Sequence, residues 1–144
     1  MSIEPAVRGY VVPAGEGVPD RSPEVKASGR ATAGSLTVME ISVDEGPPKH
    51  THTREDESIY IFTGALHVEC GADRFEAGPA SFVFLPRNLP HTFRAIGGTA
   101  TGLLIITPGG LDEYFAELHT ALSRNADRAE IALVQEKYGI IRSP

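Results

Sequence analysis

Residues 46–64 read GPPKHTHTREDESIYIFTG and residues 85–93 read LPRNLPHTF, and these stretches carry the strongest signal in the chain. In an extended strand, side chains two positions apart point to the same face, so His50 and His52 project together. Glu57 follows five residues later, which leaves room for a bend before its own strand. His91 comes from a distant strand and could close the site from across a barrel. We therefore predict a metal site formed by His50, His52, Glu57 and His91.

The chemistry of these four side chains limits the metal. Three neutral imidazoles and one carboxylate suit a borderline divalent ion, whereas Ca and Mg prefer shells made only of oxygen. We expect one divalent transition metal per chain, which could be Fe, Mn, Ni, Co, Cu or Zn. Four protein ligands can close a tetrahedral zinc site, but a larger coordination number leaves positions open for water, dioxygen or a chelating substrate. Catalysis requires the open arrangement.

The two stretches resemble the two motifs of the cupin superfamily. The first family motif reads HxHxxxxE and is followed by six residues and a glycine, which match His50, His52, Glu57 and Gly64. The second family motif reads PxGxxH, and it resembles Pro86, Asn88 and His91.

The chain departs from the family pattern only at turn and backbone positions. Asn88 replaces a glycine, and asparagine tolerates a left-handed backbone nearly as well. Asp44 stands where the family has its opening glycine, and Gly46 lies only four residues before the first histidine. Ala80 and Ala95 replace a further glycine and the final asparagine. The four metal-ligand positions are intact.

The resemblance is to small single-domain cupins similar to quercetin 2,3-dioxygenase-like proteins, and it implies a reaction. In such relatives the three histidines would be fixed ligands, while Glu57 would be both a ligand and a base that takes a proton from the substrate. The implied function is a dioxygenase acting on a small aromatic or enolic compound, such as a flavonol or polyketide. Two alternatives stay open: a non-oxidative cyclase, isomerase or lyase of secondary metabolism, and a non-catalytic small-molecule binding protein.

Short apolar runs alternate with Gly, Pro and Asp from Gly9 to about Pro108, which is typical of many short strands in a sandwich or barrel. We expect strands at residues 35–43, 58–63, 65–70, 81–85, 92–96 and 101–107. Helical spacing then predicts one helix over 111–122 and another over 126–138, the latter docked on the outside of the barrel. With the resemblance, this predicts an all-β fold: a cupin double-stranded β-helix (jelly-roll) barrel at 1–110, with two C-terminal α-helices at 111–144 packed on the same domain.

Composition excludes several function classes. The 144 residues carry a formal charge of −6, which argues against a nucleic-acid partner or an anionic membrane surface. The residues after Met1 do not read as a secretory signal. The single Cys70 cannot form an internal disulfide and is expected to be a small apolar filler. We therefore expect a cytoplasmic protein with a small-molecule substrate.

The alternation of side chains along the strands predicts roles for the remaining candidate residues. Phe93, Ile59 and Ile61 share faces with the ligands, which suggests an apolar substrate pocket, although ordinary core packing is favoured for the isoleucines. Tyr60 and Phe62 fall on the opposite face, where a partner subunit could cover them, so we expect a homodimer. We expect His67 and His119 to be bystanders, meaning that they take no part in the site. We expect Arg54, Glu55 and Asp56 to form a solvated loop at its rim.

Overall fold

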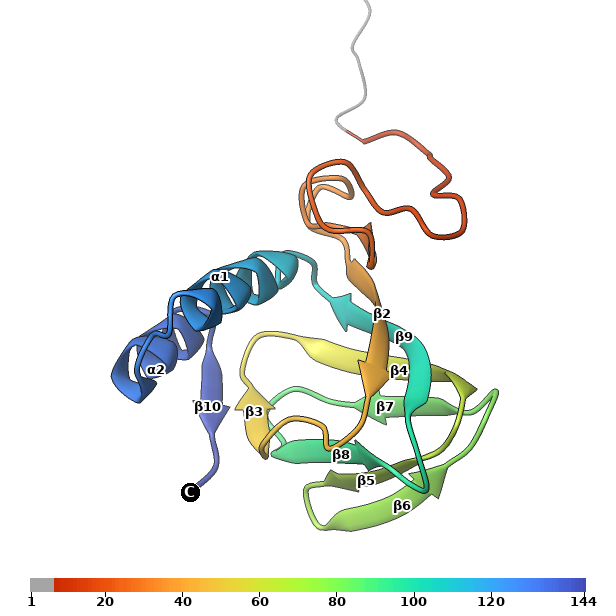
Figure 1. The fold of residues 1–144 in the computed structure, drawn as a ribbon, viewed down its shortest axis with the longest axis vertical. Coiled ribbons are helices and arrows are strands. Elements are labelled where there is room, and N and C mark those ends of the chain that lie inside the picture. Colours follow the sequence, from red (N-terminus) through yellow and green to blue (C-terminus); the bar gives the residue numbers. More distant parts are fainter. Residues whose placement is uncertain (1–6) are drawn as a thin grey trace, which may run out of the picture.

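A computed structural model describes residues 7–144, and its ten strands in that range form two five-stranded antiparallel sheets (Figure 1). The first sheet has the order β1-β2-β9-β4-β7. Its strands are β1 (Val25–Ala27), β2 (Thr37–Val43), β9 (Ala100–Thr107), β4 (Asp56–Thr63) and β7 (Phe82–Leu85).

The second sheet has the order β10-β3-β8-β5-β6. Its strands are β10 (Ile140–Arg142), β3 (His50–His52), β8 (His91–Ala95), β5 (Leu66–Cys70) and β6 (Asp73–Ala77). Neighbours in both sheets are mostly far apart in sequence, as in a barrel whose strands cross between two layers. The predicted all-β fold, a barrel of two sheets followed by two helices, is confirmed.

The core lies between the sheets because the strands alternate buried and exposed residues. In β4 the side chains of Glu57, Ile59 and Ile61 are buried, while Tyr60 and Phe62 are exposed, as their parity predicts. The strand β5 buries Leu66, Val68 and Cys70 in the same core. Burial also raises the pKa of the Cys70 thiol, so this side chain acts as an apolar filler.

Two helices follow the barrel, α1 (Asp112–Ser123) and α2 (Arg128–Lys137). Asp112 and Glu113 lie in the first turn of α1, where the helix dipole favours negative charge. The side chain of Asp127 caps α2 by accepting a hydrogen bond from the backbone N–H of Glu130 at 2.9 Å. No helix among the described residues is both long and apolar enough to span a membrane.

After α2 the chain returns to the barrel and pairs β10 with β3, so both helices and β10 lie together beside β3 in Figure 1. The sequence predicted neither this strand nor the short strands β1 and β6. Three residues are too few for a periodic pattern, and four of the five residues in β6 are exposed. The helices also line the cavity described below, instead of only covering the outside of the barrel.

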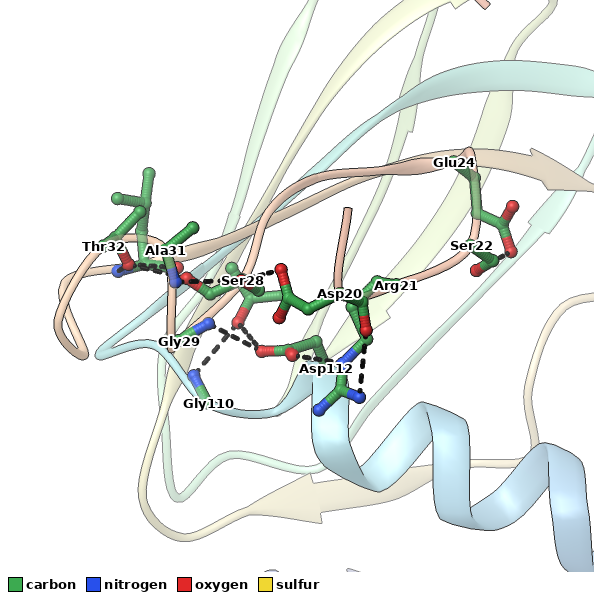
Figure 2. Close-up of polar contacts among 12 residues, drawn as sticks. Asp20, Arg21, Ser22, Glu24, Ser28, Gly29, Ala31, Thr32, Gly110 and Asp112 are labelled. Carbon is green, nitrogen blue, oxygen red and sulfur yellow. Dashed lines mark hydrogen bonds and ion pairs between the residues drawn. The ribbon is translucent and has the colours of Figure 1, made fainter. Parts of the chain in front are cut away.

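The N-terminal segment is held to the barrel by the carboxylate of Asp112, which is only 2% exposed. This carboxylate accepts hydrogen bonds from the Arg21 guanidinium at 2.7 Å, the Gly29 backbone N–H at 2.9 Å and the Thr37 hydroxyl at 3.1 Å. Figure 2 shows Arg21 and Gly29 converging on Asp112 at the start of α1. One side chain therefore joins the N-terminal segment, β2 and α1. No secretory signal is expected after Met1; residues 1–6 of that stretch lie outside the described residues.

Candidate metal centre

Three strands bring the predicted metal site together. His50 and His52 point inward from β3, and His91 is the register partner of His50 on the neighbouring strand β8. Glu57 enters from β4, which belongs to the opposite sheet. The cluster therefore lies between the two sheets, and it needs the barrel to close before its members can meet.

The four side chains converge to metal-binding distances. One ligand atom from each of them lies within 4.8 Å of all the others. His50 Nε2 lies 3.0 Å from His52 Nε2. The two Glu57 oxygens lie 2.9 Å from His52 Nε2 and 3.2 Å from His91 Nε2. The structure thus brings together all four residues that the sequence selected.

Local hydrogen bonds orient the ring nitrogens. His50 Nδ1 lies 2.8 Å from the carbonyl oxygen of Pro48, and it must donate its proton there because that oxygen can only accept. His50 Nε2 is then unprotonated in the neutral ring and faces the cluster. His91 Nε2 is buried 3.2 Å from a Glu57 oxygen, but this contact does not have the geometry of a hydrogen bond. A buried imidazole nitrogen that faces a carboxylate without forming a good hydrogen bond fits a metal ligand better than a member of a hydrogen-bonded polar core.

The protonation states agree with this fit. Burial lowers the pKa of His50 from 6.5 to about 4, so the ring is neutral at pH 7. Burial alone would raise the pKa of Glu57, but its contacts with His52 and His91 outweigh burial and hold that pKa below its usual value. Neutral imidazole and ionised carboxylate are the forms that bind a metal.

Tight turns place the two motif segments around the cluster. Gly46 has φ +74°, and a Cβ there would lie 1.7 Å from the carbonyl oxygen of Phe93, so only glycine fits. Asn88 has φ +68°, the left-handed conformation expected from its place in the second motif. Its backbone N–H donates to the carbonyl of His52 at 2.8 Å and so ties the second motif to the first.

A mostly apolar cavity of about 430 Å³ opens onto the cluster, within the usual size range of a small-molecule site. Its walls come from β2, β3, β4, β8, β9, both helices and β10. The apolar wall residues include Ile41, Val43, Phe93, Leu104, Phe115, Leu118, Leu122, Ile131 and Ile140.

Of the three predicted pocket residues, Phe93 lies on the cavity wall. Ile59 and Ile61 are buried in the core and do not line the cavity. The bystanders His67 and His119 lie outside the four-residue cluster.

Sequence reasoning missed several residues at this site. Tyr114, Gln135 and Arg142 line the cavity from the helices and β10. Tyr114 falls on the apolar face of the helix predicted over 111–122, which was the available signal, whereas nothing in the sequence marked Arg142. Glu55 was expected in a solvated loop, but it is only 8% exposed, burial raises its pKa, and its Oε1 has no hydrogen-bond partner among the described residues. That expectation was wrong for Glu55, whereas Arg54 is exposed as expected.

Comparison with known proteins supports the predicted cupin fold. Residues 37–107 match the family model of the cupin domain. KdgF from Halomonas sp. superposes with a TM-score of 0.54 at 21% identity, covering 62% of this chain and 79% of that chain. A Streptomyces PAC13 variant solved with uridine has a TM-score of 0.48 at 21% identity, covering 52% of this chain and 60% of that chain; Pac13 is described as a nucleoside dehydratase. A search of curated proteins gave no match.

Proposed function

We propose, on the premise that residues 37–107 form a cupin domain, that this chain is a metal-dependent dioxygenase acting on a small aromatic or enolic compound. The observation that carries the proposal is the position of the cluster of His50, His52, Glu57 and His91. It lies where an apolar cavity of about 430 Å³ ends, so a bound molecule would rest against it.

The residues of the chain have distinct parts in this proposal. His50, His52, His91 and Glu57 would hold one divalent transition metal, which supplies a Lewis acid and open positions for substrate and dioxygen. Glu57 is ionised at neutral pH, so one of its oxygens can accept the proton of a substrate hydroxyl. The apolar walls hold the ring and exclude water. Both oxygen atoms of dioxygen enter the product, so the reaction needs no external reductant.

The first test is the metal content of protein purified without added metal. We expect about one ion per chain in the wild type and a large loss in His50→Ala, His91→Ala and Glu57→Ala, because each substitution removes a ligand. Substituting a residue that only hydrogen-bonds to a metal ligand lowers metal affinity by about 10- to 100-fold in other proteins, so removing a ligand itself should lower it at least as much. His119→Ala, on α1 outside the cluster, is the matched control and should keep the metal.

The second test separates the reaction classes. Metal-loaded protein should consume dioxygen when it receives flavonols or catechols, and the Glu57→Ala variant should not. Turnover by the zinc-loaded protein without dioxygen would replace the dioxygenase with a non-oxidative enzyme. Wild-type protein that refuses iron, manganese, cobalt, nickel, copper and zinc on titration would overturn the metal site itself.

A further inference from the structure

The cavity holds one positive side chain that the metal cluster does not use. Arg142 lies on β10 and is the register partner of His50 on β3. Side chains of directly opposed residues in an antiparallel pair project from the same face of the sheet. Arg142 accordingly lines the same cavity as His50, together with Tyr114 and Gln135.

No described residue makes an ion pair or a hydrogen bond with the Arg142 side chain in this structure. Two other polar groups of the cavity make hydrogen bonds within the protein. The Asp44 carboxylate accepts a hydrogen bond from the Thr99 hydroxyl at 2.5 Å, and the Gln135 amide donates to the Tyr114 hydroxyl at 3.4 Å. Glu57 belongs to the metal cluster. The guanidinium therefore keeps all of its donors available to a ligand.

The net charge of the protein bears on which ligands could bind beside Arg142. With a formal charge of −6, the protein repels anions in general, and the Arg142 guanidinium adds a local positive charge to the one that a metal ion in the cluster would supply. A guanidinium matches the planar geometry of a carboxylate and can bind it through two parallel hydrogen bonds. The cavity thus has a metal-binding end, apolar walls and, on an exposed part of its wall, a guanidinium without a side-chain partner among the described residues.

We propose that the substrate carries a carboxylate that pairs with Arg142, in addition to the oxygen atoms that reach the metal cluster. This inference rests on the proposed function and narrows it to aromatic or enolic acids. Arg142 is then a residue that determines substrate specificity. The strands β3 and β10 place the arginine one strand away from His50, a separation of about 5 Å between backbones, so a compact ring can reach both groups.

The test compares acids with their methyl esters on zinc-loaded protein, where no oxidation interferes. The probes are 3,4-dihydroxybenzoate and the longer 3,4-dihydroxycinnamate, each beside its ester, with Kd measured by calorimetry. For at least one pair, the ratio of ester Kd to acid Kd should be about fivefold higher in the wild type than in Arg142→Gln, which is the scale of one partly exposed ion pair. Arg94→Gln removes the same charge from an exposed position on β8 that does not line the cavity, and should leave the ratio unchanged.

Two negative outcomes have different meanings. Esters that bind the zinc-loaded wild type, with ratios equal in the wild type and Arg142→Gln for both pairs, would overturn the carboxylate inference and leave the proposed function standing. Failure of acids and esters alike to bind a protein that does hold zinc would overturn the proposed substrate chemistry, and this inference with it.

Discussion

His50 carries the clearest link between the site and stability. Its Nδ1–H donates to the carbonyl oxygen of Pro48, and its ring is neutral at pH 7. Three other titratable side chains lie beside it. Burial holds its pKa near 4 in the folded protein, while the unfolded chain keeps the ordinary value of 6.5. Between these two values the unfolded chain binds a proton that the folded protein does not. Stability of the metal-free protein must therefore fall as the pH falls from 6.5 to 4.

We expect this window to contribute on the order of 2 kcal/mol, reduced from the full shift because the ring is partly exposed. The measurement is urea unfolding of metal-free protein at several pH values between 6.5 and 4. His50→Gln should flatten the dependence, and His67→Gln, on a different strand outside the cluster, should not. Glu57 acts in a lower window, because its pKa is depressed and its contribution is lost only below about 4.5. Equal slopes in wild type and His50→Gln would contradict the assignment.

At the level of elements, one carboxylate ties α1 to β2 and to the N-terminal segment. Asp112 begins this helix and binds β2 and the N-terminal segment, while Tyr114, two residues further on, lines the cavity. Burial alone would raise the pKa of Asp112, but hydrogen bonds from Gly29, Arg21 and Thr37 outweigh burial and lower it. The ionised carboxylate is therefore the form that holds these elements together.

Asp112→Asn should destabilise the protein by about 2–4 kcal/mol, because the new amide N–H₂ group would face a group that now donates a hydrogen bond to the carboxylate. The free energy of unfolding in urea measures this loss. Asp73→Asn makes the same chemical change at an exposed position of β6 and should alter stability by less than about 0.5 kcal/mol. Equal effects of the two substitutions would show that the Asp112 contacts contribute no stability.

On the scale of the whole molecule, the outer face of the first sheet is unusually aromatic. Phe82 and Phe84 on β7 are 63% and 51% exposed, and Tyr60 and Phe62 extend the same face on β4. Tyr60 is the register partner of Phe82. Together the four rings leave on the order of 400 Å² in water, about half of what a standard interface takes from each partner. A second copy of the chain is the expected cover, so the homodimer stays a prediction.

Sedimentation velocity tests it directly. We expect a dimer in the wild type and a monomer in Phe84→Glu, because a buried unpaired carboxylate disrupts an apolar interface. Leu133→Glu is the control, since Leu133 is 65% exposed on α2, away from this sheet, and its substitution should leave the dimer intact. A wild-type monomer at every concentration would refute the prediction.

The sequence by itself determined the strand periodicity, the inward face of β4 and the four residues of the candidate metal centre. The strand faces and the pair of His50 and His52 depend on a local rule, because side chains alternate along a strand and two histidines two positions apart share a face. Glu57 and His91 joined this pair through the resemblance to the two cupin motifs. Asn88 could be read the same way, because its left-handed backbone is a property of one residue and its turn.

Only the tertiary structure decided what surrounds the centre. The pairing of β10 with β3 brings Arg142 beside His50 across 92 positions of sequence, and a three-residue strand carries no periodic signal. The burial of Glu55 and the helical wall of the cavity likewise depend on how loops and helices pack. Contacts between distant segments follow from which apolar faces cover one another, and the order of residues along the chain does not state that pairing.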